Sequence, residues 1–486
     1  MPQARQELVF AIRLRVIACY GGQFCLVVAA LNLVTLSVAL LNGEQLVAVS
    51  YALIILGLFC LGIPFSRLRI EGPVQMNEAM TLVALVFLGV PLIMTIPLLL
   101  SGVPFSDALF ETVSAATTTG LSTLPSIEAQ SFIFRFSRAW MQWYGGLGIV
   151  VLSLAIVVRP GMAAMRLSNL ESVDDLAGGT RAHARRVLAV YGCLTFAGVL
   201  VWILLGGKPL DGLLYVLAAV STGGFAPTDG SFADLPGLRL AWVATLACLA
   251  GAVPLTLYSH VRRKRWRTFF NDIELRALIV AAVLATMVLG INLWLQGMSV
   301  QDLATHAPLM AVSAQTTAGF SSIAPANLDA GSKAILILSM AIGGSAGSTA
   351  GGFKILRLLV LAGLLYRCLR SMSVPPDAVV DQRLGRRRID PAEVQDALMI
   401  ILMFVGVVFL SWLPFLMYGY NPLDALFEVV SATGTVGLSC GVTQAALPGF
   451  LKLTLCADML LGRLEFVVWM VFFYHRTWVG RKRGAK

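Results

Sequence analysis

Four short segments of the chain place hydroxyl-bearing residues within two positions of a glycine. They read TTTGLS at 117–122, STGGFA at 221–226, TTAGFS at 316–321 and GTVGLS at 434–439. Glycine tolerates unusual backbone angles and carries no side chain that could block the carbonyl oxygens around it. A ring of such oxygens can replace the water shell of a dehydrated cation. The pattern therefore indicates a cation site built from backbone oxygens, with candidate residues Thr118, Thr119, Gly120, Thr222, Gly223, Gly224, Thr317, Ala318, Gly319, Thr435, Val436 and Gly437.

A longer phrase around two of these segments occurs twice. FETVSAATTTGLSTL at 110–124 resembles FEVVSATGTVGLSCG at 427–441 without gaps. The residue thirteen positions before the aligned glycine is an acid in three segments and a histidine in one: Asp107, Asp211, His306 and Asp424. Self-similarity of this kind marks an internal repeat. We therefore predict four copies of a unit made of a helix, a re-entrant segment and a second helix, preceded by two additional helices.

The composition is that of a multispanning membrane protein, because 58% of the residues are hydrophobic and 13% are charged. The net charge of +10 comes from short basic clusters between apolar stretches. It does not form the continuous basic face that a nucleic-acid partner would need. Ten stretches reach the roughly 20 residues that cross a bilayer, near 16–41, 47–66, 79–101, 139–158, 187–206, 238–258, 274–296, 334–365, 396–418 and 452–474. The alternation of basic clusters predicts that both termini are cytoplasmic.

Four semi-apolar segments, near 105–124, 209–226, 303–321 and 422–440, are the re-entrant candidates. Irregular backbone at membrane depth is tolerated only where protein buries it or where it lines a water-filled cavity. We expect an all-α protein of ten transmembrane helices, with four pseudo-symmetric repeats around a central pore. The three short helices that begin at an aspartate would be capped by it, and each short helix would point its negative C-terminal end toward the pore. The predicted units are residues 1–75 (two N-terminal helices), 76–180, 181–268, 269–390 and 391–486.

The apolar stretch from Lys333 to Arg370 is too long for one straight helix. Its 38 residues would measure roughly 57 Å at about 1.5 Å per residue, against a hydrocarbon core of about 30 Å. A break is therefore predicted within GGSAGSTAGGFK, although the same glycines at spacing four also fit a helix packed closely on a neighbour. The phrase GSTAGGFK is not a phosphate-binding loop, because Lys354 comes one residue late and no soluble strand precedes it.

Several charged residues lie within or beside the apolar segments. Arg463 stands in the last span, where a charge is costly and is a functional candidate. Neither Asp458 nor Glu465 is three or four residues away, so its partner must lie elsewhere, and a salt bridge to another helix is the structural alternative. Glu111 and Glu428 suit the first turn of a short helix. We expect them to stabilise those helices rather than to bind an ion.

These motifs resemble the Trk/Ktr/HKT superfamily of potassium transporters, and within it the bacterial Trk-type potassium uptake transmembrane subunit, over essentially the whole chain. QWYGGLGIVVLSLAI at 142–156, GGSAGSTAGGFKILR at 343–357 and LLGRLEF at 460–466 are similar to further family signatures. The resemblance implies a pseudo-fourfold potassium pore with one filter glycine per repeat and an arginine, Arg463, facing the pore beneath the filter. It also implies an intramembrane gate loop, with candidate residues Gly343, Gly344, Gly347, Ser348, Thr349, Gly351, Gly352 and Lys354.

The resemblance further implies a homodimer in the bacterial inner membrane, gated by a cytosolic nucleotide-binding subunit of the RCK type, similar to TrkA. Nucleotide would act only through that partner, with K⁺ as the transported ion and no covalent cofactor. A proton- or sodium-coupled symporter using the same pore is the alternative, for which Asp458 and Glu465 are the candidate carboxylates. An enzyme is not expected, because catalysis needs converging groups and the four histidines are scattered.

Overall fold

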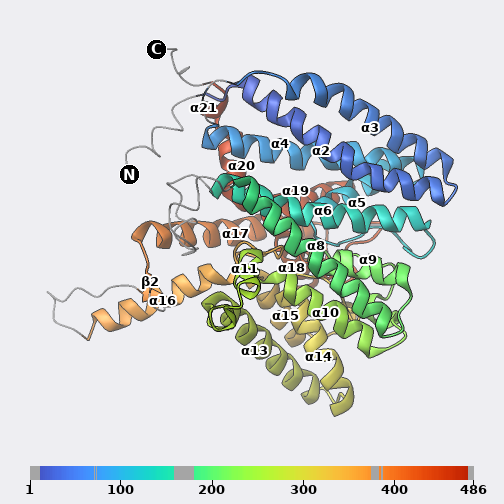
Figure 1. Ribbon diagram of the computed structural model, residues 1–486. Coiled ribbons are helices and arrows are strands. Elements are labelled where there is room, and N and C mark those ends of the chain that lie inside the picture. Colours follow the sequence, from blue (N-terminus) through green and yellow to red (C-terminus); the bar gives the residue numbers. More distant parts are fainter. Residues whose placement is uncertain are drawn as a thin grey trace.

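The computed structural model describes residues 11–70, 72, 74–157, 180–373, 383–384 and 387–479, which form a bundle of helices (Figure 1). The longer helices are α2 (Leu14–Leu41), α3 (Gln45–Ser66), α4 (Met76–Leu100), α6 (Phe132–Val157), α8 (Thr180–Leu204), α10 (Leu238–Ala252), α13 (Ile273–Leu295), α15 (Ala330–Ile342), α16 (Ile355–Ser371), α17 (Pro391–Met417), α19 (Gly449–Arg463) and α20 (Glu465–Phe473). Four helices between them end at the predicted cation-binding segments: α5 (Phe105–Ala116), α9 (Pro209–Val220), α14 (Val300–Gln315) and α18 (Pro422–Thr433). The smaller elements are η2 (Ser231–Asp234), η3 (Leu255–Leu257), α11 (Tyr258–Arg262), α12 (Trp266–Phe270), η4 (Pro325–Asn327), α21 (His475–Trp478) and one antiparallel pair, β1 (Arg383–Leu384) with β2 (Arg387–Arg388).

The helical membrane architecture predicted from composition is confirmed. Every one of the ten predicted spans falls on one or two helices of the described chain. Six single helices there are long and apolar enough to cross a membrane, and a bent pair raises that number to seven. The total of ten transmembrane helices stays a prediction, because two of the remaining spans are broken helices and the third lies on α6, at the edge of the described residues.

Three of the predicted spans are not continuous. The helix pair Leu238–Ala252 and Leu255–Arg262 bends by 90°, and Pro254 lies in the break, where it cannot donate a backbone hydrogen bond. The second break separates α15 from α16, as the length of that stretch predicts. The third lies between α19 and α20, where Glu465 takes a φ of +56°. The sequence predicts only the second break, because a single proline or an ordinary Leu-Glu pair is a weak signal.

The two N-terminal helices form a layer outside the repeats. Helices α2 and α3, drawn in blue, lie along each other and beside α4 (Figure 1). A side chain at Gly22 would overlap backbone of α3, so glycine allows the close approach of these two helices. Arg13 is ion-paired with the buried Glu78 near the start of α4, at 2.7 Å. The N-terminal layer is thus joined to the first repeat.

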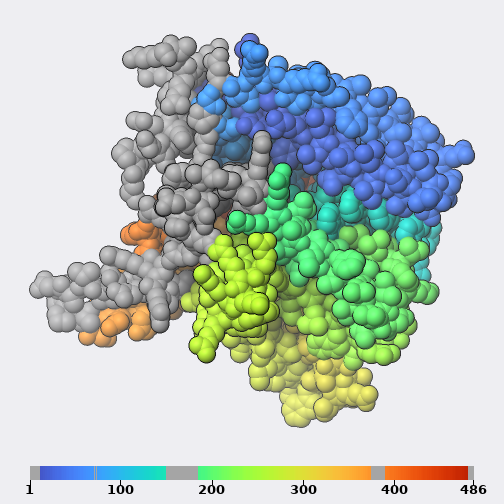
Figure 2. Space-filling view, viewed as in Figure 1, coloured from blue at the N-terminus to red at the C-terminus, as the bar shows by residue number. Residues whose placement is uncertain are grey.

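Four similar units follow the N-terminal layer. Each consists of a long helix, a short helix and a second helix: α4–α5–α6, α8–α9–α10, α13–α14–α15 and α17–α18–α19. The second and third units, green to yellow, lie below the blue N-terminal helices, and α16 projects from the bundle (Figures 1 and 2). Where one repeat ends and the next begins along the chain stays a prediction.

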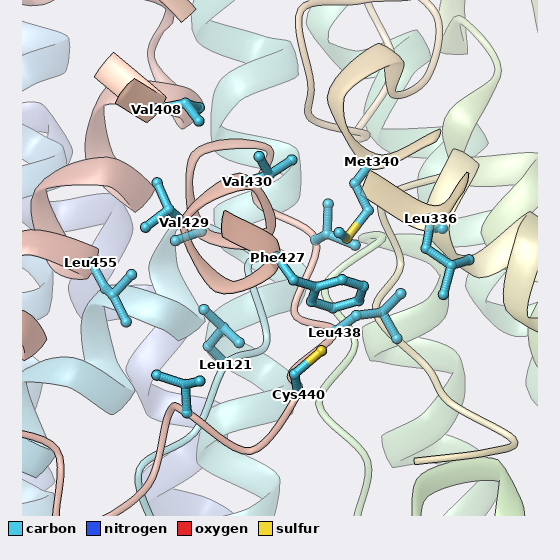
Figure 3. Packing of buried hydrophobic residues seen from close by; sticks show 14 of the residues in the cluster. Leu121, Leu336, Met340, Val408, Phe427, Val429, Val430, Leu438, Cys440 and Leu455 are labelled. Atoms are coloured by element: carbon cyan, nitrogen blue, oxygen red, sulfur yellow. The ribbon is translucent and has the colours of Figure 1, made fainter. Parts of the chain in front are cut away.

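The largest hydrophobic core surrounds the fourth short helix. Phe427 of α18 is fully buried and lies near Leu438, which follows the fourth glycine segment (Figure 3). Met340 and Leu336 of α15 approach from the neighbouring unit. Side chains of two repeats therefore meet directly behind the predicted cation-binding segments, which holds those segments in place.

Candidate functional site

Each of the four short helices ends in a turn with the same unusual backbone. Two residues past the helix, a threonine takes a positive φ: Thr118 (53°), Thr222 (51°), Thr317 (55°) and Thr435 (49°). Two residues further on, the aligned glycines have positive φ as well: Gly120 (93°), Gly224 (78°), Gly319 (73°) and Gly437 (95°). A β-branched residue rarely adopts such angles. The same strain at four matching places indicates that the surrounding structure imposes it.

The four turns form a closed ring. A side chain added at each aligned glycine would overlap a carbonyl oxygen of the next repeat: Gly120 meets Gly223, Gly224 meets Ala318, Gly319 meets Val436 and Gly437 meets Thr119. The last of these contacts returns to the first repeat, so the ring has no gap. The predicted residues from all four repeats are therefore brought together, and Gly224 rather than Gly223 is the aligned glycine of the second repeat.

Serine and glutamate side chains anchor the first and fourth turns. Ser114 Oγ accepts a hydrogen bond from the backbone N–H of Gly120, and Ser431 Oγ accepts one from Gly437, both at 3.0 Å. Glu428 accepts four hydrogen bonds from the chain beyond its glycine, donated by Ser439 Oγ, Cys440 N, Val442 N and Thr443 Oγ1. These bonds fix the path of the backbone on both sides of the glycine.

The expectation that the two glutamates lie in the first turn of their helices is wrong. Glu111 and Glu428 lie in the middle of α5 and α18, not in the first turn. Glu111 accepts from Ser122 Oγ at 2.6 Å and is ion-paired with the buried Arg138 at 2.7 Å. Their carboxylates therefore hold the segment that leaves each turn. The repeated serines at 122 and 439 were the available sequence signal for this contact.

The expectation that the aspartates cap their helices is also wrong. The N-cap residues are Pro104, Lys208, Ser299 and Asn421. Asp107 instead bonds Lys452 of α19 at 2.5 Å, and Asp424 bonds Lys333 of α15 at 2.7 Å. Relative to its aligned glycine, the third helix starts four residues earlier than the other three, so His306 lies inside α14, where its Nδ1 is 3.0 Å from Ser322 Oγ. The aspartates of the first and fourth repeats thus join one repeat to the preceding one.

Replacing Lys452 with methionine is expected to lower the thermal-denaturation midpoint of the detergent-solubilised protein markedly. The change leaves the carboxylate of Asp107, whose side chain is 10% exposed, without its cation. Breaking one side of a buried ion pair costs about 3–5 kcal/mol. Lys208→Met, at an exposed lysine, is the control. Equal midpoints for the two variants would contradict this view of the ion pair.

The predicted gate residues lie in a loop, residues 343–354, between α15 and α16. This confirms the predicted break, and the alternative of one helix with a glycine ladder is wrong. Positive φ values bend the loop at Gly343, Gly347, Gly352 and Lys354. Local hydrogen bonds close it: Ile355 N donates to Gly344 O at 3.0 Å, Ser348 Oγ donates to Ser345 O at 2.6 Å, and Lys354 Nζ donates to Ala350 O.

The loop lies directly against the turns of the ring. Three hydrogen bonds join them: Gly351 N to Thr317 Oγ1 (2.7 Å), Gly352 N to Gly434 O (3.0 Å) and Thr222 Oγ1 to Thr349 Oγ1 (3.2 Å). A side chain at Gly351 would overlap Gly434 O and Thr435 Oγ1. The loop is therefore packed against the turns of the second, third and fourth repeats.

Arg463 donates to two backbone carbonyl oxygens, one of which belongs to this loop. Its Nη1 lies 2.6 Å from Thr349 O and its Nη2 lies 3.4 Å from Gly145 O of α6. Among the described residues, no acid forms a salt bridge with it. Arg463 therefore joins the loop to the first repeat. The alternative of a salt bridge to another helix is not seen among the residues that the structure describes.

A second set of glycines occupies matching positions in the four repeats, and the prediction from sequence did not align them. Gly145, Gly251 and Gly462 each stand thirteen residues after the start of α6, α10 and α19, and Gly343 occupies the matching place after α15. Side chains at the first three would overlap the last carbonyl oxygen of the short helix in the same repeat. An alignment of the second helices, rather than of the short ones, would have revealed them.

Fold and site together define a multispanning membrane protein with four pseudo-symmetric repeats around one ring of backbone carbonyls. Comparison with known proteins identifies its family. The family described as "TrkH: Cation transport protein" matches residues 47–477, and the chain belongs to that family.

Relatives and a solved structure agree with this assignment. The chain is 31% identical over 404 residues to the Trk system potassium uptake protein TrkI of Halomonas elongata, covering 81% of each protein. It is 28% identical over 424 residues to TrkH of Escherichia coli, covering 84% of this chain and 87% of that one. The crystal structure of the potassium transporter TrkH from Vibrio parahaemolyticus matches with a TM-score of 0.85 at 25% identity, covering 96% of this chain and all of that one. The chain is thus a Trk-type potassium transporter.

Proposed function

We propose that this protein takes up potassium through a channel-like pore whose selectivity filter is the ring formed by the four turns. The observation that carries the proposal is the closure of that ring, since each aligned glycine abuts a carbonyl of the next repeat. The oxygens that would bind the ion in this ring are the backbone carbonyl oxygens of Thr119, Gly223, Ala318 and Val436. Such oxygens replace the hydration shell of a monovalent cation.

Potassium is the expected ion because all four repeats carry glycine at the aligned position. In the plant branch of the superfamily that the sequence resembles, a serine at the first position marks sodium transport, and this chain has Gly120 there. One matched glycine per repeat offers fewer complete rings than a five-residue channel filter. Selectivity for potassium over sodium is therefore expected to be moderate.

We further infer that loop 343–354 is the gate. Its hydrogen bonds to Thr317, Gly434 and Thr222 support this role, because they tie the loop to the filter turns from below. The relatives named Trk system proteins suggest a system of more than one component. We propose a cytosolic nucleotide-binding subunit of the RCK type as the partner that moves the loop, and a homodimer in the inner membrane with both termini in the cytoplasm.

Channel-like conduction is favoured over ion-coupled symport by the surroundings of two acids. Asp458 accepts a hydrogen bond from Ser411 of α17 at 2.6 Å, and Glu465 is ion-paired with Arg357 of α16 at 2.8 Å. Coupling would need a titratable carboxylate in the conduction path. Neither acid contributes a hydrogen bond to the four filter turns in the described chain.

The test is rubidium-86 uptake into liposomes that contain the purified protein, with potassium or sodium as competitor. Potassium should compete better than sodium. Gly437→Ser should reduce that preference about tenfold, because its side chain would overlap the carbonyl of Thr119 and displace a ligand. The matched control is Gly419→Ser, at a glycine that also has positive φ but has open space around it.

The two variants separate filter geometry from general backbone strain. Equal loss of preference in both would refute a filter at Gly437. If the wild-type protein shows no rubidium uptake, the measurement is repeated with the cytosolic partner and nucleotide added. Absence of uptake under those conditions as well would count against the proposed pore.

A further inference from the structure

The four filter turns are not anchored in the same way. In the first repeat Ser114 and Glu111, both on the short helix, hold the turn and the segment that leaves it. The corresponding positions of the second repeat, six and nine residues before the glycine, are Ala218 and Tyr215. Alanine cannot accept the hydrogen bond that the serine accepts. The second turn must therefore be held by a side chain from elsewhere.

That side chain is Gln142 of α6, which belongs to the first repeat and is fully buried. Its Nε2 donates a hydrogen bond to Gly223 O, and its Oε1 accepts one from Phe225 N at 3.2 Å. The backbone N–H of Phe225 can only donate, which fixes the orientation of the amide. The two bonds flank Gly224, the aligned glycine, on both sides.

The second repeat contains two consecutive glycines because each has a different neighbour. Gly224 abuts Ala318 O of the third repeat, as the other aligned glycines abut their neighbours. A side chain at Gly223 would overlap the amide group of Gln142. Gly223 thus leaves room for Gln142, and the pair at 223 and 224 serves the anchor and the ring respectively.

We propose that Gln142 is a positioning residue that sets the preference for potassium over sodium by holding the Gly223 carbonyl, an inference that rests on the proposed filter. Gly223 O is the ring oxygen that meets Gly120. The hydrogen bond from the Gln142 amide restrains the movement of this oxygen and occupies one of its lone pairs. A restrained ligand with a weaker field cannot close around the smaller sodium ion, since selectivity depends on the number, field strength and flexibility of the carbonyls.

The test compares Gln142→Met with Gln315→Met by rubidium-86 uptake under potassium or sodium competition. Gln142→Met keeps the approximate side-chain length and removes both hydrogen bonds. Sodium should then compete about fivefold better relative to potassium, which is the factor expected from losing the one hydrogen bond that restrains Gly223 O. Gln315 is equally buried and donates to Gly343 O of the gate loop at 2.7 Å. Gln315→Met should change the rate of uptake but leave the ratio of the two competitors unchanged.

A third variant separates the two bonds of Gln142. Measured at a pH at which its carboxyl group is ionised, Gln142→Glu keeps an oxygen for Phe225 N and loses the donor to Gly223 O, so it should weaken the preference as Gln142→Met does. It also decides the question if the methionine variant does not fold. A folded variant lacking the donor that retains the wild-type ratio overturns the inference while the proposed filter stands. A wild type in which sodium competes as well as potassium overturns the proposed filter itself.

Discussion

Replacing Glu428 with leucine is expected to abolish rubidium uptake by the reconstituted protein. The carboxylate is fully buried and accepts hydrogen bonds from two hydroxyls and two backbone N–H groups beyond the fourth filter glycine. Leucine has a similar volume but no acceptor. Each of the four buried donors left unsatisfied costs about 1–3 kcal/mol, so the native conformation of this segment becomes less stable by at least about 4 kcal/mol. Uptake should fall by more than about 100-fold.

Two further substitutions show whether the loss is specific. Glu428→Gln keeps one acceptor oxygen and should retain part of the uptake. Glu44→Leu removes a carboxylate between α2 and α3 that accepts one hydrogen bond, from Ser131 Oγ at 3.0 Å, and it should transport like the wild type. Near-normal uptake by Glu428→Leu would show that the fourth turn does not depend on this anchor.

Replacing Arg463 with methionine is expected to increase the time that the pore spends open when no cytosolic partner is present. The guanidinium donates to Thr349 O of loop 343–354 at 2.6 Å. A hydrogen bond to a charged group contributes about 1.5–3 kcal/mol. Its loss should therefore raise the ratio of open to closed protein about 10- to 100-fold, provided that the bond exists only in the closed state. Single-channel recording in planar bilayers measures this ratio directly.

Arg463→Lys distinguishes the hydrogen bonds from the charge. Lysine keeps a positive charge near the filter but cannot reach two carbonyls with one planar group. Its open time should lengthen as in the methionine variant, whereas its single-channel conductance should stay lower than that of Arg463→Met. An unchanged open time in both variants would remove Arg463 from the closing mechanism and leave it as a link between α19 and α6.

The four turns have the same backbone conformation, but the side chains that anchor them differ from repeat to repeat. All four turns share the positive φ at threonine and glycine. The supports differ: serine and glutamate hold the first and fourth turns, and Gln142 holds the second. The carbonyl ring needs one geometry to enclose an ion, whereas any buried donor or acceptor can secure a turn from behind. The repeats of this chain therefore share the backbone of the turns and differ in the side chains that secure them.

Much of the fold could be predicted because it depends on local patterns. Apolar stretches predict helices, four related segments predict four repeats, and the aligned glycines predict the turns that meet in the ring. The break before Ile355 follows from length alone. The roles of Asp107 and Glu111 could not be obtained in this way, because the sequence shows that an acid belongs to a short helix but not which distant group it contacts.

The sequence by itself determined the class of protein, its repeats and the residues of the candidate filter. Only the tertiary structure decided what joins them. Gln142 and Gly223 are 81 residues apart, Arg463 and Thr349 are 114 apart, and Lys452 and Asp107 are 345 apart. Such pairs have no local periodicity that could reveal them, since each forms only when separate repeats pack around the common axis. The physical reason is that helix formation is governed by neighbours along the chain, whereas the ring of turns and its contacts with loop 343–354 are governed by neighbours in space.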